Sequence, residues 1–154
     1  MIVCAVDPAE KNFAVSVWSS EKGFVSFKLI DVRKIKGDIV DKVVTLQRQG
    51  LFDACDVLLI ERQMRARYKC MAAALKALNI DKTRMVAPQS VKRYFGTGNK
   101  GKGAYSANKK SHVKLARNLL NGEERVVFET FKKKDDIADC VAMTRWYTDK
   151  YLKK

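Results

Sequence analysis

The sequence has little histidine, proline and glycine, and it lacks a long apolar run. Its 154 residues include one histidine, two prolines and eight glycines. The single histidine, His112, excludes a metal site with two histidine ligands and disfavours histidine-assisted serine and cysteine hydrolases. No apolar stretch approaches the roughly 18 to 20 residues needed to cross a bilayer, so the sequence predicts no membrane-spanning helix. Any enzymatic chemistry must therefore use carboxylates and lysines.

Paired cysteine spacing is also absent. Cys4, Cys55, Cys70 and Cys140 are scattered along the chain, which favours free thiols over disulfides or a zinc site. The start of the sequence, MIVCAVD, has neither the basic segment nor the cleavage region of a signal peptide. We therefore expect a protein of the cytoplasm, the nucleus or a viral replication compartment, and neither a secreted nor a membrane protein.

Acidic residues are missing from one long stretch of the chain. The whole sequence has 31 basic and 17 acidic residues, a net charge of +14, yet residues 82–122 contain ten lysines and arginines and no aspartate or glutamate. Cations placed along a phosphate backbone release condensed counterions and give strong, salt-sensitive binding. This segregation predicts a surface that binds a polyanion, with a soluble basic surface as the simpler alternative.

The remaining pattern predicts one α/β domain over residues 1–154, since 47% hydrophobic content is enough for a core. Short apolar or alternating runs predict strands at 2–7, 13–19, 24–32, 56–61 and 84–88. Helical spacing predicts helices at 35–49, 62–79, 89–95, about 110–121 and 134–151. The glycine- and lysine-rich stretch 96–110 is expected to be a mobile loop. A β-meander followed by βα units would place the first and fourth strands side by side.

Four acidic residues stand where these elements would bring them together. Asp7 ends the first expected strand, Glu61 ends the fourth, and Asp136 and Asp139 lie in the last helix. Singly, each is explained as a turn, rim or helix-start residue. Together they predict a site for a hard cation such as Mg²⁺, which prefers oxygen ligands. Helical spacing leaves Asp135 as an alternative to Asp136, because each shares a face with Asp139.

Five segments in the same order resemble motifs of one known family. They are AVDPAEKNFAVSV (5–17), LLIERQ (58–63), APQSVKRYFGTG (87–98), ANKKSHV (107–113) and DDIADC (135–140). These segments are similar to the motifs of the RuvC-type Holliday-junction resolvases and their poxviral and mitochondrial relatives, in the ribonuclease H-like superfamily. Two positions depart from the pattern: Ala9 replaces a glycine and His112 replaces a glutamine. The resemblance implies a three-layer fold with a five-stranded mixed sheet flanked by helices.

The resemblance also implies the roles of particular residues. It assigns the metal ligands to Asp7, Glu61, Asp136 and Asp139, and so selects Asp136 over Asp135. It places a catalytic or DNA-contacting lysine at Lys92 and a second catalytic lysine at Lys110. The cations expected to contact DNA are Lys92, Arg93, Lys100, Lys102, Lys109 and Lys110. The inserted lysines of 99–103 have no counterpart in the family pattern.

The function implied is that of a homodimer that binds four-way DNA junctions and nicks two strands symmetrically. We expect Mg²⁺-dependent hydrolysis with two ions per active site, and Mn²⁺ as an alternative ion. Two other functions fit the same residues. One is a ribonuclease H-like nuclease acting on RNA–DNA hybrids, flaps or forks, and the other is a non-catalytic basic nucleic-acid-binding protein.

Overall fold

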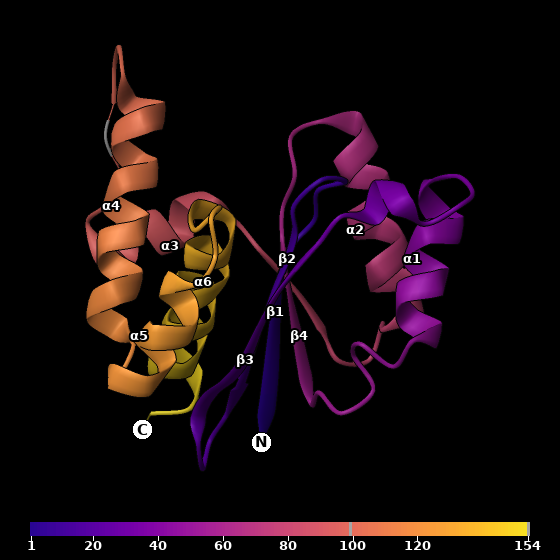
Figure 1. Cartoon of the computed structure of the whole chain (residues 1–154), viewed down its shortest axis with the longest axis horizontal. Coiled ribbons are helices and arrows are strands. Elements are labelled where there is room, and N and C mark those ends of the chain that lie inside the picture. Colours follow the sequence, from indigo (N-terminus) through magenta and orange to yellow (C-terminus); the bar gives the residue numbers. More distant parts are fainter. Residues whose placement is uncertain (99, 154) are drawn as a thin grey trace.

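A five-stranded sheet separates two helical layers (Figure 1). The computed structural model describes residues 1–98 and 100–153, so Asn99 of the predicted 96–110 loop lies outside the described residues, as does Lys154. The strands are β1 (Ile2–Asp7), β2 (Phe13–Ser19), β3 (Gly23–Ile30), β4 (Val57–Glu61) and β5 (Thr83–Val86), in the spatial order β3-β2-β1-β4-β5. The first three strands pair antiparallel, whereas β1–β4 and β4–β5 pair parallel. The predicted mixed sheet and the predicted adjacency of β1 and β4 are confirmed.

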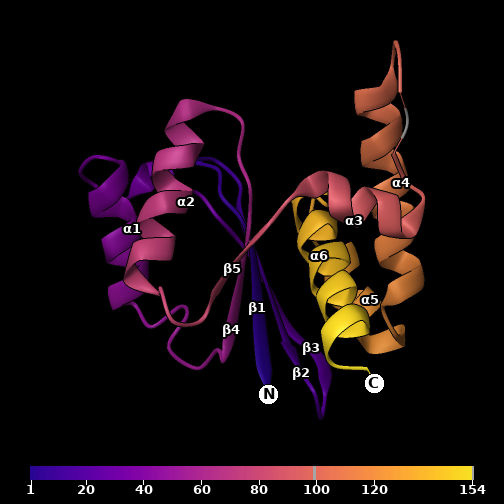
Figure 2. The ribbon, with the colours of Figure 1, turned by 180° about the vertical axis from the view of Figure 1, so that it is seen from behind.

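Helices cover both faces of this sheet. One face carries α1 (Ile39–Arg48) and α2 (Ala66–Leu78) (Figure 1). The opposite layer contains α3 (Pro88–Phe95), α4 (Ala104–Leu119), α5 (Gly122–Glu129) and α6 (Asp135–Tyr151), as the reverse view also shows (Figure 2). Within the described ranges, no helix is both long enough and apolar enough to span a membrane.

The alternation of side chains in β1 supplies a core on each face. Val3 and Ala5 pack with residues of α6, whereas Cys4 and Val6 pack with residues of α1 and α2. Successive side chains of a strand point to opposite faces, so a strand covered on both sides reads as a continuous apolar run. The run that ends at Asp7 is therefore explained by two cores rather than one.

The same parity determines where the strand-end acids point. Asp7 continues the Val3–Ala5 series, and Glu61 continues the series of Leu59, which belongs to the same core as α6. Val6 pairs with Ile60 in the parallel register, and Asp7 and Glu61 are the residues directly after this pair. Both acids consequently end adjacent strands on the face covered by α6.

The loop predicted over residues 96–110 is wrong in part, and one helix was missed. The expected loop 96–110 becomes helical at Ala104, directly after Gly103, whose φ of 82° ends the preceding turn. A helix at 122–129, α5, was not predicted. It starts at Asn121, whose side chain accepts from the Glu124 backbone N–H while Glu124 accepts from the Asn121 N–H. This reciprocal capping box is sufficient to begin a short helix after the end of α4.

Other boundaries shift by a few residues, and side-chain caps explain two of these shifts. Strand β3 ends at Ile30, since Asp31 caps a short 3-10 turn over Val32–Lys34. Helix α1 begins at Ile39 rather than 35, after a capping box centred on Asp38. Helix α2 begins at Ala66 rather than 62, with Arg65 in an extended conformation before it.

Glu124 joins α5 to the edge strand and gives a test of the fold. Its Oε1 accepts from the Phe24 backbone N–H at 2.6 Å, and its Oε2 accepts from the Asn121 N–H at 2.8 Å. We expect Glu124→Ala to lower the free energy of unfolding by about 1–3 kcal/mol, because two donors lose their partner. Urea unfolding followed by circular dichroism measures this loss. Glu123→Ala, an exposed change in the same turn, should cost clearly less, and equal losses would contradict the assignment.

Candidate active site

Three carboxylates from three elements meet at one end of the sheet. Asp7 ends β1, Glu61 ends β4, and Asp139 lies in the second turn of α6, which packs on β1 and β2. One carboxylate oxygen from each residue lies within 4.8 Å of the others. The parallel pairing of β1 and β4 places the first two side by side, and α6 brings the third across the face. This group contains three of the four predicted metal ligands.

The electrostatics of this group favour a cation. Desolvation raises the pKa of Asp7 to about 7, and the negative charges of Asp139 and Asp136 add to the rise. Burial also holds the pKa of Glu61 well above its usual value, with further increases from Asp7 and Asp139, whereas the Lys92 charge opposes them. Carboxylates are desolvated and crowded at the same point, which is costly unless a positive charge compensates. The donor set consists of oxygens alone, which suits Mg²⁺ or Mn²⁺.

Asp136, the fourth predicted ligand, lies in the first turn of α6 outside the three-residue group. Its Oδ2 is buried and has no hydrogen-bond partner among the described residues, and Lys133 Nζ lies 3.5 Å from it. Burial raises the pKa of Asp136, as do the charges of Asp135 and Asp139. An orphaned buried carboxylate oxygen beside the group is consistent with a further cation ligand.

Asp135, which helical spacing left as an alternative metal ligand to Asp136, forms ion pairs with two lysines. Its Oδ2 accepts from Lys109 Nζ at 2.5 Å and from Lys133 Nζ at 2.8 Å. Burial opposes ionisation, but these hydrogen bonds outweigh it and lower the pKa of Asp135. Asp135 therefore faces a different cluster from Asp139, although the two lie on the same helix.

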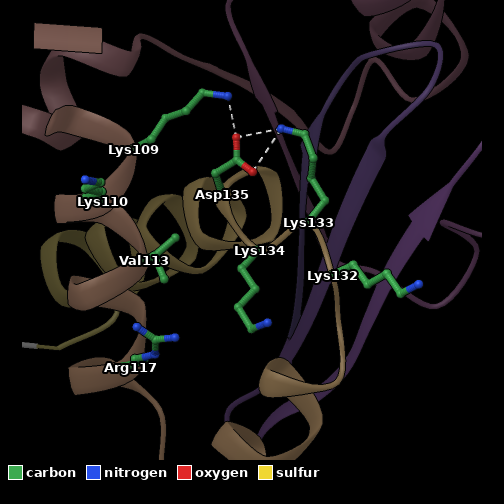
Figure 3. Close-up of a pocket in the computed structure, with 8 residues that line it drawn as sticks. All are labelled: Lys109, Lys110, Val113, Arg117, Lys132, Lys133, Lys134 and Asp135. Atoms are coloured by element: carbon green, nitrogen blue, oxygen red, sulfur yellow. Dashed lines mark hydrogen bonds and ion pairs between the residues drawn. The ribbon is translucent and has the colours of Figure 1, made fainter. Parts of the chain in front are cut away.

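Five of the six predicted cations line one of two hollows in the surface. Lys92 and Arg93 of α3 line a hollow of about 420 Å³ with Lys100, and the charge of Lys92 lowers the pKa of Glu61. Lys109 and Lys110 of α4 line a second groove beside the start of α6 (Figure 3). Lys102 is exposed in the turn before α4. The side chain of Lys110 is exposed and lines the groove. The catalytic role expected for Lys110 therefore stays a prediction.

Two further residues contact the acidic group and were assigned no role from sequence. Gln63 Nε2 donates to Asp7 Oδ1 at 3.0 Å. His112 is buried, with Nδ1 hydrogen-bonded to Asp139 Oδ1 and Nε2 lying 2.9 Å from Thr97 Oγ1. The only available signal for His112 was its position in the ANKKSHV segment, where the resembling family has glutamine. Such partners orient metal-ligating side chains.

Comparison with known proteins agrees with this geometry. Residues 1–150 match the family described as poxvirus A22 protein. The chain belongs to the poxvirus A22 protein family. A search of curated protein sequences found no match for this A22 family member.

Solved structures share its fold at low sequence identity. The fowlpox virus Holliday junction resolvase is 18% identical with a TM-score of 0.68, covering 97% of this chain and 99% of that chain. A fowlpox virus resolvase in complex with substrate Holliday junction DNA is 19% identical with a TM-score of 0.72, covering 99% and 100%. T. thermophilus RuvC in complex with a Holliday junction substrate is 11% identical with a TM-score of 0.63, covering 98% and 96%. The A22 family member therefore has the ribonuclease H-like fold that the resemblance implied.

The raised pKa of Asp7 predicts how metal-free stability depends on pH. Its folded value of about 7 exceeds the ordinary 3.8, so the folded state binds the proton more tightly and loses stability as pH rises from about 4 to about 7. Asp7→Asn removes this loss. We expect the variant to exceed the wild type by on the order of 1–4 kcal/mol at about pH 8, and by little at about pH 4.

Thermal denaturation in chelator across this pH range measures the difference. Asp81→Asn is the matched control, since Asp81 is exposed in the turn between α2 and β5, at the opposite end of the sheet. A constant difference between Asp7→Asn and wild type at every pH would contradict the assigned pKa.

His112 gives a second prediction for this site. We expect His112→Ala to weaken Mg²⁺ or Mn²⁺ binding by about 10–100-fold, because Asp139 loses the group that orients it. His112→Gln should retain more affinity, since an amide can still donate to the carboxylate. Isothermal titration calorimetry measures the binding, and wild-type affinity in His112→Ala would remove the orienting role.

Proposed function

We propose that this protein is a Holliday junction resolvase, a metal-dependent endonuclease that nicks four-way DNA junctions. The observation that carries the proposal is the convergence of Asp7, Glu61 and Asp139 within 4.8 Å beside a cationic face. A protein that only binds polyanions gains nothing from a desolvated acidic group next to its ligand, because the acids repel phosphates. The shared fold with the fowlpox virus and T. thermophilus resolvases supports the choice of substrate.

Each residue of the site has a defined task in hydrolysis. Asp7, Glu61 and Asp139 would hold the divalent ions, and Asp136 would complete the ligand set from the first turn of α6. Mg²⁺ bound there would supply a water activated for hydrolysis and positive charge beside the phosphate. His112 and Gln63 keep Asp139 and Asp7 in position. Lys92 and Lys110 stabilise negative charge that develops on the phosphate.

The cationic face extends from the acids toward one end of the molecule. The C-terminal ends of β1 and β4 point to the end at which the start of α4 projects beyond the other helices (Figure 1). Lys100 and Lys102 precede this projection, and Lys92 and Arg93 lie on α3 behind it. DNA approaching this end meets cations around the acidic group. The six expected DNA-contacting residues therefore remain our proposal for the interface.

A homodimer fits the paired nicks of a symmetric junction. Helix α2 exposes small side chains at alternating spacings of four and three residues: Ala66, Cys70, Ala73 and Ala77. That spacing forms one stripe on a helix, and small side chains permit close approach of a second helix. We assign this stripe to contact with a second copy of the chain.

Loss of one ligand should abolish cleavage without abolishing binding. We expect Asp7→Asn to cut a synthetic four-way junction at least about 100-fold more slowly in Mg²⁺, the scale of losing several kcal/mol of stabilisation. Its affinity for the junction should equal or exceed that of wild type, because a negative charge is gone. Single-turnover assays on denaturing gels and fluorescence anisotropy measure the two effects.

The matched control is again Asp81→Asn, which should cut at the wild-type rate. Cleavage by Asp7→Asn at the wild-type rate, or cleavage by wild type in chelator, would falsify the metal assignment. Comparing a junction, a flap and an RNA–DNA hybrid at one salt concentration separates a resolvase from a nuclease of broader substrate range. Binding without any cleavage in Mg²⁺ or Mn²⁺ would leave a non-catalytic basic protein.

A further inference from the structure

A cationic groove beside the acidic site contains four cations, Arg117 and Lys132 to Lys134, that have no role in the function proposed so far. It lies between α4 and the segment that joins α5 to α6, with a volume of about 490 Å³ (Figure 3). Its cationic lining residues are Lys109, Lys110, Arg117, Lys132, Lys133 and Lys134. Among the described residues that line it, Asp135 is the only acid. Three of these cations come from the run 132–134, which lies outside the predicted DNA-contacting set.

Asp135 holds the two walls of the groove together. It accepts from Lys109 of α4 and from Lys133 of the opposite wall, so a single carboxylate bridges both sides (Figure 3). The hydrogen bonds to Asp135 and Tyr105 raise the pKa of Lys109, which keeps it charged. Within residues 1–98 and 100–153, Lys110 and Lys132 form no ion pair or hydrogen bond, so their charges remain available to a ligand.

The groove starts next to the candidate metal ligands. Lys109 contacts Asp135, and His112 contacts Asp139, so the same two helices carry both contacts about one turn apart. One helical turn advances about 5.4 Å, and the stretch of α4 from Lys109 to Arg117 advances about 12 Å. At about 3.4 Å of axial rise per nucleotide, that length accommodates roughly three to four phosphates of one strand.

The chemistry of the lining selects the backbone of a nucleic acid rather than its bases. Val113 is the one apolar side chain among the lining residues, and no aromatic ring lines the described groove. Bases bind on aromatic platforms, whereas phosphates bind to lysine and arginine. Arg117 is paired with Glu129 at 2.5 Å but is exposed, so it can exchange that partner for a phosphate.

We propose that this groove binds the sugar–phosphate backbone of a junction arm beside the nicked phosphate, with Lys132 and Arg117 as its main phosphate contacts. The proposal rests on the proposed function, since it names the part of the DNA that the nuclease holds. The strand would then be held both at the metal ligands and in the groove. Because two points of contact restrict sliding of the strand, the groove would fix which phosphate reaches the metal ligands.

The test measures junction binding against salt concentration in chelator, where no cleavage occurs. The slope of log affinity against log salt falls by about one for each phosphate that the protein no longer binds. We expect Lys132→Ala to reduce the slope by about one and Lys132→Ala/Arg117→Ala by about two. Lys132→Arg should restore the slope, because it restores the charge. Lys22→Ala is the matched control, since Lys22 lies in the β2–β3 turn at the end of the sheet opposite Asp7.

Ethylation interference locates the bound phosphates on the DNA. Ethylating the phosphates next to the nicked one should weaken binding by wild type and by Lys22→Ala, but have much less effect on the double variant. Thermal denaturation of each variant shows whether it is folded, and Lys132→Ala alone suffices if the double variant is not. Wild-type slopes and wild-type interference patterns in a folded Lys132→Ala variant overturn the proposal.

Cleavage by wild type in Mg²⁺ separates this outcome from failure of the proposed function. If wild type nicks the junction and the groove variants bind with the wild-type slope, only the groove assignment fails. If wild type neither binds nor nicks the junction, both proposals are overturned. If the affinity of the groove variants falls only as far as that of Lys22→Ala, the effect is general charge and the groove is not a specific binding surface.

Discussion

Mutual repulsion among Asp7, Glu61 and Asp139 is the constraint on which the rest of the structure depends. Desolvated like charges within 4.8 Å oppose the folded state. The structure holds them because each is attached to a rigid element: two paired strands and a helix packed against them. Burial of the apolar cores on both faces of the sheet stabilises the fold and offsets the repulsion among the three carboxylates. The site is thus a local exception to an otherwise consistent fold.

The cations are distributed so that attraction for DNA does not cancel the acidic site. Asp135 takes up Lys109 and Lys133 through ion pairs, and Lys133 also lies 3.5 Å from Asp136 Oδ2. Asp139 instead interacts with His112, the single histidine. Helix α4 therefore supplies a different kind of partner to Asp135 and to Asp139. One acid is neutralised within the protein, whereas the other retains its capacity to bind a cation.

Sequence alone predicted the elements whose residues interact with near neighbours. The apolar runs ending at Asp7 and Glu61 identified two buried strands, and chain order placed them side by side. Helix α5 was missed because its signal is the capping box of Asn121 and Glu124 rather than an apolar stripe. The glycines of 96–103 masked the early start of α4. A local cap, and not the hydrophobic pattern, decided the start of α5.

Some residues of the site could be predicted from local sequence, whereas others depend on tertiary contacts. Helical spacing could not choose between Asp135 and Asp136, because the choice depends on which neighbouring helix each one faces. Contact between His112 and Asp139 joins residues 27 positions apart on two helices whose packing the sequence did not reveal. Gln63 was visible in the LLIERQ segment, yet its bond to Asp7 depends on the pairing of β1 with β4.

The parallel register of β1 and β4 has a consequence for how this sequence can diverge. Inserting or deleting one residue within either strand would turn its terminal acid to the α1–α2 face, since side chains alternate. An insertion or deletion in β1 or β4 therefore needs a second, compensating change upstream of Asp7 or Glu61 in the same strand. Without it, the two acids no longer share one face of the sheet. The β2–β3 turn lies at the far end of the sheet, so a change of length there leaves the direction of both acids unchanged.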